Sequence, residues 1–134
     1  MNDKEKIDTF LANGPHAVVG ASTDRNKYGN KVLRAYLQND LPVFPINPKA
    51  DEVEGIKAFP DLASLPVSVH GISVITPPKV TEAVVEEAAK LGIRNVWLQP
   101  GAESDAAIQR ARELAMNLIA AGPCILVELR YRES

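Results

Sequence analysis

The chain has 134 residues, of which 46% are hydrophobic and 24% charged, with a formal net charge of -2. This length predicts one domain, residues 1–134, with a core that needs neither disulfides nor structural metal. The composition excludes a disordered chain and a disulfide scaffold, and the slight acidic excess gives no overall positive field for nucleic acid. A single cysteine and the lack of a long apolar run predict a cytoplasmic protein with no membrane partner.

Short apolar runs alternate along the chain with longer segments of helical periodicity. A leading helix is expected over residues 3–13, broken by Gly14 and Pro15, before a buried strand at residues 16–20. Further strands are expected at residues 41–46, 71–75, 95–98 and 118–120. Apolar residues at helical spacing predict the helices between them: Val32, Leu33, Tyr36 and Leu37; Val80, Val84, Ala88 and Leu91; and Ala107, Ile108, Ala111, Leu114 and Ala115.

The segment between residues 47 and 66 contains several prolines and a glycine, which predicts a long connection. A minor strand near residues 56–59 and a helical turn near 61–65 are expected within it, and the tail from Ile125 to Leu129 is left unassigned. Strands that alternate with helices predict an α/β fold: a three-layer, doubly wound, mostly parallel sheet of Rossmann-like type. Ligands of such folds bind at the carboxyl ends of the strands, near the point where strand order reverses.

Small and polar residues follow the first predicted strand: Gly20, Ala21, Ser22 and Thr23, with Lys27 shortly after them. Small residues let the backbone approach a ligand closely, and the helix that follows directs free N–H groups toward an anion. The loop is not the G-x-G-x-x-G motif of dinucleotide-binding domains. It predicts either a phosphate-binding turn or an ordinary strand-to-helix turn with exposed polar residues.

The second predicted strand ends in Asn47, Pro48 and Lys49. NAD-binding domains place an acidic residue here to hold the ribose hydroxyl groups, and residues 45–49 contain none. Lys49 instead offers a cation, which favours a ribose that carries a phosphate, as in NADP or coenzyme A. The alternative is a solvated lysine, the usual state of this residue type.

The third predicted strand ends in Thr76 and two prolines, and the fourth ends in Gln99, Pro100 and Gly101. The prolines suit the first turn of a helix, and they can also form a rigid apolar edge for a ligand. Gln99 can both donate and accept hydrogen bonds, and Gly101 permits close approach of a ligand.

Taken together, these segments resemble the CoA-binding domain family. That family is the Rossmann-like domain at the N-terminus of the succinyl-CoA synthetase alpha subunit, and it also occurs as small stand-alone bacterial proteins. The resemblance runs from about His16 to the C-terminus. The motifs that carry it are Gly20-Ala21-Ser22, Lys27-Tyr28-Gly29-Asn30-Lys31-Val32, Pro45-Ile46-Asn47-Pro48-Lys49, Glu54-Gly55, Thr76-Pro77-Pro78 and Trp97-Leu98-Gln99-Pro100-Gly101.

The resemblance implies a single CoA-binding domain with coenzyme A across the strand ends. Its motif positions imply that the turn from Gly20 to Thr23 holds phosphate groups and that Lys49 faces the 3′-phosphate region. They also imply that Lys27 assists the diphosphate. The full set of implied ligand-binding residues is Gly20, Ala21, Ser22, Thr23, Lys27, Asn47, Lys49, Ile75, Thr76, Pro77, Gln99 and Gly101.

The sequence also departs from the family pattern near its end. Stand-alone members usually show an Asp-Arg-Cys run before a C-terminal Glu, whereas this chain has Gly122-Pro123-Cys124 with Glu128 following. Cys124 is expected to be either a small buried hydrophobe or a thiol that forms a mixed disulfide with bound CoA.

The residue pattern favours binding of CoA or acyl-CoA without catalysis. Metal-ligand spacing is absent, and Ser22 has no histidine partner because His16 and His70 both precede strands, at the opposite end of the sheet. Both histidines are therefore expected to be structural or solvated. Two alternatives stay open: an NADP-dependent oxidoreductase or redox module, and an interaction protein without a ligand. A homodimer or a partner enzyme also stays open.

Overall fold

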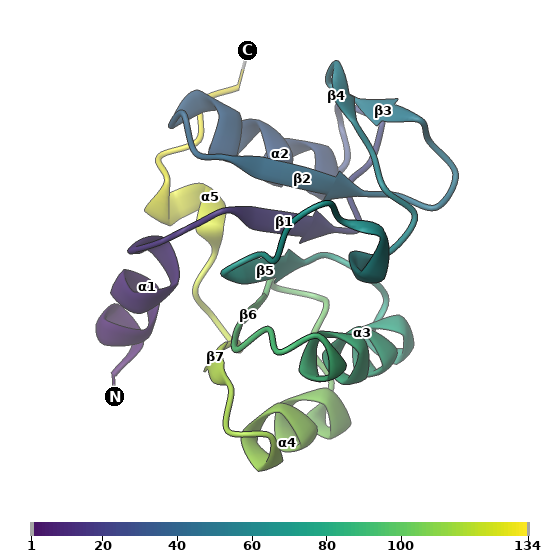
Figure 1. Cartoon of the computed structure of the whole chain (residues 1–134). Helices are drawn as coiled ribbons and strands as arrows, with labels where there is room; N and C mark the ends of the chain where they lie inside the picture. The colour runs from purple at the N-terminus through teal and green to yellow at the C-terminus, as the bar shows by residue number, and fades with distance from the viewer. Residues whose placement is uncertain (1, 134) are drawn as a thin grey trace.

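A five-stranded parallel sheet forms the centre of the computed structural model, which describes residues 2–133 (Figure 1). The strand order is β2-β1-β5-β6-β7. This arrangement confirms the expected doubly wound α/β fold, because the chain moves outward from β1 in one direction to β2 and in the other to β5, β6 and β7. The strands are β1 (His16–Val19), β2 (Val43–Ile46), β5 (Gly71–Val74), β6 (Asn95–Leu98) and β7 (Asn117–Ile119).

Helices cover both faces of this sheet. On one face lie α1 (Asp3–Leu11), α2 (Tyr28–Gln38) and α5 (Ile125–Glu128). The other face carries α3 (Pro78–Lys90) and α4 (Asp105–Glu113). Because successive strand residues point to opposite faces, each buried strand supplies both cores. Trp97 packs in the core beneath α2 and α5, while its neighbour Leu98 packs in the core beneath α3 and α4.

The edge strand β2 contains Pro45, which an edge position tolerates because a proline cannot donate to the ladder. The chain then forms a small hairpin, β3 (Glu52–Val53) and β4 (Ile56–Lys57), before a 3-10 turn at η1 (Leu62–Ser64). Phe59 bridges to Ile46 on the outer side of β2. The expected minor strand is thus present as β4, whereas β3 had not been expected.

Helix boundaries follow local chemistry. The Asn2 side chain accepts from Glu5 N at 2.9 Å and begins α1, while the Ser104 hydroxyl accepts from Ala107 N at 3.0 Å and begins α4. Pro78 is the first residue of α3, as predicted. The unassigned tail forms the short helix α5, with Cys124 immediately before it.

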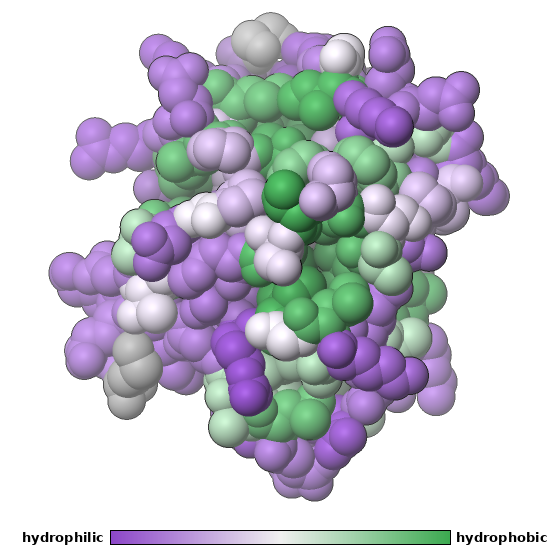
Figure 2. Space-filling view, in the orientation of Figure 1, coloured by the Kyte–Doolittle hydropathy of each residue, from purple (hydrophilic) through white to green (hydrophobic). Residues whose placement is uncertain are grey.

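Hydrophobic residues reach the surface in a band across the middle of one side, surrounded by hydrophilic ones (Figure 2). Two exposed apolar side chains, Val67 and Leu91, contribute to a hollow of about 240 Å³ between the η1 region and the end of α3. Over residues 2–133, no helix is long and apolar enough to cross a membrane.

Candidate functional site

The strand order reverses between β1 and β5, so two loops leave the carboxyl end of the sheet side by side. The ladder continues just past the strands, with Ile75 N donating to Val19 O at 2.8 Å and Gly20 N to Ile46 O at 3.3 Å. The residues after β1, β2 and β5 are therefore fixed relative to one another. This is the place where doubly wound sheets bind their ligands.

The loop after β1 requires glycine at two positions. Gly20 has a φ of +98°, and a Cβ there would lie 1.9 Å from the carbonyl oxygen of Ile75. A Cβ at Gly29, in the first turn of α2, would lie 2.0 Å from the carbonyl oxygen of Gly20. Both approaches are far below van der Waals contact. The end of β1 can therefore lie against the end of β5 only with glycine at position 20, and the start of α2 can lie over the end of β1 only with glycine at position 29.

The polar residues of this loop mostly hold its own backbone. The Ser22 hydroxyl accepts from Asp24 N at 3.0 Å, and Asp24 Oδ1 accepts from Asn26 N at 2.9 Å. Thr23 and Lys27 are exposed, and Lys27 precedes the first residue of α2 without capping it through its side chain. The loop thus presents a shaped backbone and an exposed ammonium group.

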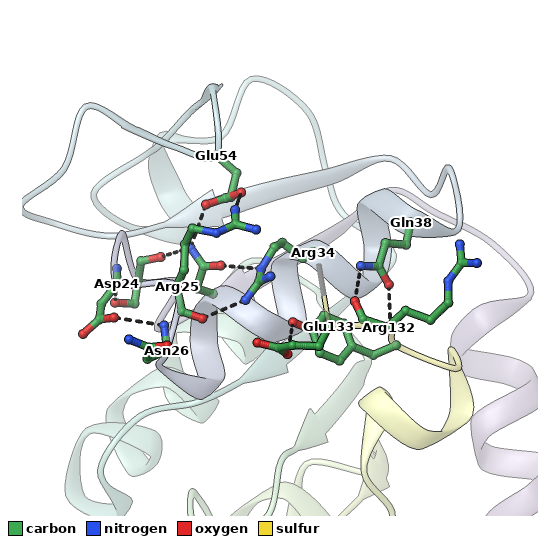
Figure 3. Close-up of polar contacts among 11 residues, drawn as sticks. Asp24, Arg25, Asn26, Arg34, Gln38, Glu54, Arg132 and Glu133 are labelled. Carbon is green, nitrogen blue, oxygen red and sulfur yellow. Dashed lines mark hydrogen bonds and ion pairs between the residues drawn. The ribbon is translucent and has the colours of Figure 1, made fainter.

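A buried arginine ties the loop to α2 and the β3–β4 hairpin (Figure 3). Arg34 donates to Asn30 Oδ1 at 2.7 Å and to the carbonyl oxygen of Arg25 at 2.7 Å. Asn30 in turn donates to Glu54 at 3.0 Å, and Arg25 forms an ion pair with the same carboxylate. The hydrogen bond from Asn30, aided by Arg25, lowers the pKa of Glu54. We call this set of bonds among Arg25, Asn30, Arg34 and Glu54 the brace. The sequence pointed to Glu54 only as part of a motif and did not predict the brace.

The first hollow at this end of the sheet has a volume of about 390 Å³. Its walls are mainly apolar, and Lys49 lines it together with the carboxyl residues Asp61 and Glu87. Asn47 shapes one side by donating to Ala21 O at 2.9 Å and accepting from Lys49 N at 2.8 Å. The lining residues are Val19, Gly20, Ala21, Ile46, Asn47, Pro48, Lys49, Pro60, Asp61, Thr76, Val80, Val84 and Glu87.

A second hollow, of about 310 Å³, lies between the ends of β5 and β6. Its lining is Tyr28, Ile75, Thr76, Pro77, Pro100, Gly101 and Ala102. Thr76 borders both hollows, and its hydroxyl is hydrogen-bonded to that of Thr81 at 2.7 Å. The two hollows are thus neighbours along the carboxyl end of the sheet.

Eight of the twelve residues proposed from sequence line one of these two hollows. Ser22, Thr23 and Lys27 lie instead on the loop beside them, while Gln99 is fully buried. The sequence did not reveal the walls supplied by the distant segments around Pro60 and Val80. Proline after a β-hairpin and valine in a helix have no distinctive ligand-binding pattern, so no local signal identifies them.

Gln99 is bonded to Tyr28, which lines the second hollow, and to Ile125, the residue after Cys124. Its Oε1 accepts from Ile125 N at 3.0 Å and from the Tyr28 hydroxyl at 3.4 Å. The same hydroxyl contacts the Cys124 sulfur. Desolvation and the contact with Cys124 raise the pKa of Tyr28, so its hydroxyl stays protonated. Cys124 is half-buried, so it is neither the fully buried small hydrophobe nor a fully exposed thiol.

The histidines lie at the other end of the sheet, as expected. His16 is buried against Phe10, with its Nε2 2.8 Å from Phe10 O, and burial lowers its pKa. His70 Nε2 lies 3.0 Å from Thr9 O. Across the described residues 2–133, no group of three or more acidic, histidine or cysteine side chains is placed to hold a metal ion.

Comparison with known proteins places these features in context. Residues 16–130 match the model of the CoA binding domain. The chain is 29% identical over 91 residues to the alpha subunit of ADP-forming acetate–CoA ligase II from Pyrococcus furiosus, covering 67% of this chain but only 20% of that subunit.

Two solved structures match this chain over most of its length and over most of their own. A conserved hypothetical protein from Pyrococcus furiosus has a TM-score of 0.80 and 39% identity, covering 84% of this chain and 97% of that one. A hypothetical protein from Pyrococcus horikoshii has a TM-score of 0.89 and 28% identity, covering 97% and 91%. With more than half of its residues matched by the family model, the chain belongs to the CoA binding domain family.

Proposed function

We propose that this protein binds coenzyme A or an acyl-CoA as a single domain, in the two hollows at the carboxyl end of the sheet. The observation that carries the proposal is that these two hollows share Thr76 as a lining residue in a chain of the CoA binding domain family. An elongated ligand with one anionic end and one apolar arm suits such a pair of sites.

The first hollow is proposed to hold the nucleotide end. Apolar walls from Ile46, Val80 and Val84 suit the faces of an adenine ring, and Lys49 provides a cation for the 3′-phosphate. The turn from Gly20 to Thr23, with Lys27, would hold the diphosphate, because the backbone at Gly20 can be approached closely.

The second hollow is proposed to hold the pantetheine arm. Ile75, Thr76 and Pro77 would form one side, and Gly101 the other, with Gln99 bonded to Tyr28 of the lining. Ser22 lies away from His16 and His70, so no histidine can act as its base, and we propose binding without catalysis. The single cysteine suits a reducing compartment such as the cytoplasm, where a partner enzyme would use the bound ligand.

Thermal unfolding with CoA, NADP and NAD tests the proposal. A ligand that binds only the folded state raises the free energy of unfolding, by about 2.7 kcal/mol at a hundredfold excess over Kd, and the melting temperature rises with it. NADP is expected to stabilise the protein more than NAD, because NADP carries a ribose phosphate for Lys49 and NAD does not. CoA is expected to stabilise it most, because CoA has both a ribose phosphate and a pantetheine arm for the second hollow. Stabilisation by NADP alone would instead support the oxidoreductase alternative, and no shift with any ligand would support a ligand-free interaction protein.

A further inference from the structure

The thiol of Cys124 lies next to the proposed pantetheine site. Its sulfur contacts the hydroxyl of Tyr28, and Tyr28 lines the second hollow. Cys124 itself is half-buried, so the sulfur is neither sealed in the core nor free on the surface. Tyr28 therefore connects the only cysteine of the chain to the hollow in which the arm of CoA would end.

Two buried side chains of the β6 segment fix the backbone around this thiol. Trp97 Nε1 donates to the carbonyl oxygen of Pro123 at 3.0 Å, one residue before Cys124. Gln99 Oε1 accepts from the backbone N–H of Ile125 at 3.0 Å, one residue after it. Both side chains are fully buried, so the position of Cys124 is set by the sheet on either side.

Gln99 also carries an unused hydrogen-bond donor at this place. Its side chain has no solvent exposure, and its Nε2 has no partner. The orientation of the amide follows from its neighbours, because the N–H of Ile125 requires an oxygen opposite it. A buried N–H group without an acceptor costs about 1–3 kcal/mol. An acceptor supplied by a ligand, such as a carbonyl oxygen of the pantetheine arm, would remove this cost.

We propose that Cys124 is a thiol–disulfide exchange site for CoA disulfides, with Gln99 receiving the pantetheine arm and Tyr28 positioning the sulfur. The inference rests on the proposed CoA site. In the reaction, the Cys124 thiolate attacks one sulfur of a disulfide that contains CoA, and the sulfur–sulfur bond breaks. Cys124 is left in a mixed disulfide with one CoA, and the other half leaves as a thiolate that takes up a proton from water.

Tyr28 has a defined part in this step. Its protonated hydroxyl contacts the sulfur of Cys124 and can hold that sulfur in place for the attack. In the reduced protein the same contact holds the side chain of Cys124 beside Tyr28, which lines the second hollow. Tyr28 is therefore a positioning residue, and its removal should lower the preference of the exchange for CoA disulfide over glutathione disulfide.

The test treats the full chain with CoA disulfide or glutathione disulfide at equal concentration and follows the intact mass. Because the chain has one cysteine, any adduct is on Cys124. The expected product carries the mass of one CoA less two hydrogens and is reversed by a thiol reductant. Binding in the hollows raises the local concentration of the disulfide, so CoA disulfide should react at least about tenfold faster than glutathione disulfide.

A Tyr28→Phe variant tests the role of the hydroxyl. Exchange with CoA disulfide should slow several-fold and exchange with glutathione disulfide should change less, because the sulfur loses the contact that holds it beside the second hollow. The matched control is Tyr36→Phe. This change also removes a hydroxyl from a tyrosine of α2, but the Tyr36 hydroxyl is hydrogen-bonded to Ser73 of β5 at 2.8 Å and not to Cys124. An unchanged ratio of the two exchange rates in Tyr28→Phe would overturn the positioning role.

Calorimetry with reduced CoA in the presence of a phosphine reductant separates this inference from the proposed function. Binding of reduced CoA without any adduct from CoA disulfide would overturn the exchange site and leave the CoA site standing. Equal rates with the two disulfides would also overturn it, since Cys124 would then react as an ordinary exposed thiol. Absence of both binding and adduct would overturn the proposed function as well.

Discussion

Lys49 is the residue on which the choice of ligand depends most. It is exposed and lines the hollow at the end of β2, where NAD-binding domains have a carboxylate. Replacing Lys49 with alanine should weaken CoA binding about tenfold or more, since a charge-assisted contact contributes about 1.5–3 kcal/mol. Dephospho-CoA lacks the 3′-phosphate, so its affinity should change little. Isothermal titration of both ligands to both proteins measures the difference.

Lys90→Ala is the control for this change, because it removes the same charge from an exposed lysine at the far end of α3. CoA binding to that variant should match the unmodified protein. Equal weakening of CoA and dephospho-CoA by Lys49→Ala would show that Lys49 does not contact the 3′-phosphate.

The sequence allowed the loop residues Gly20 and Lys49 to be selected, because glycine after a strand and a missing acidic residue are local signals. It did not allow the surroundings of Gln99 to be predicted. Gln99 was expected to face ligand, yet it is fully buried and bonded to Ile125. That contact joins residues 26 positions apart through the packing of α5, which no local pattern describes.

At the level of elements, the approach of the end of β1 to the end of β5 depends on the lack of a side chain at Gly20. Gly20→Ala should destabilise the protein by more than about 3 kcal/mol, because the new Cβ adds a clash with Ile75 O to the strain of a positive φ. Gly92→Ala is the matched control: its φ is +77° but nothing lies within 4 Å of a Cβ. Its cost should be about 1 kcal/mol.

Chemical denaturation of the two variants measures this difference directly. Similar losses in free energy of unfolding would mean that the loop after β1 relaxes around the added methyl group. In that case the close approach of the ends of β1 and β5 would not depend on glycine at position 20.

The brace between the first loop and the β3–β4 hairpin should make stability depend on pH. The pKa of Glu54 is lower in the folded protein than its ordinary value, through the bond from Asn30 and the charge of Arg25. Its contribution is therefore present above the unfolded pKa and is lost as pH falls through the folded one. Glu54→Gln should lower stability near neutral pH and lose less stability than the unmodified protein between about pH 6 and about pH 3.5.

Denaturant unfolding at several pH values gives the comparison, with Glu52→Gln in the same hairpin as control, since Glu52 is exposed and its carboxylate takes no part in the brace. Parallel stability–pH curves for the unmodified protein and Glu54→Gln would contradict a role for this carboxylate.

Much of the element order was predictable because alternating apolar strands and helical periods determine a doubly wound sheet. All five sheet strands lie within two residues of their expected positions. The hairpin strand β3 and helix α5 were not predicted, since Glu52–Val53 and Ile125–Glu128 are too short for either period to show. Contacts between distant residues fix both places. Glu54, just after β3, is bonded to Asn30, and the backbone at the start of α5 is bonded to Trp97 and Gln99.

At the scale of the whole molecule, the net charges of protein and CoA oppose binding, while the proposed contacts of Lys27 and Lys49 would favour it. The chain has a net charge of -2, and CoA carries about four negative charges. At a separation of about 15 Å in water this repulsion is about 2 kcal/mol before screening. A phosphate about 4 Å from one lysine gains about 4 kcal/mol at an effective dielectric constant of about 20. The proposed contacts of Lys27 and Lys49 with the phosphates would therefore exceed the repulsion from the net charge, although Asp61 and Glu87 in the first hollow reduce that gain.

This balance predicts how salt affects binding. The Debye length is about 10 Å at 0.1 M salt, shorter than the separation that governs the overall repulsion, so that repulsion is already largely screened. Further salt then weakens chiefly the contacts of Lys27 and Lys49, and the Kd for CoA should rise several-fold between about 0.1 M and about 1 M sodium chloride. Calorimetric titrations across this range should give a shallower slope for Lys49→Ala. An affinity that improves with salt would mean that the net charge dominates and that the two lysines do not contact the phosphates.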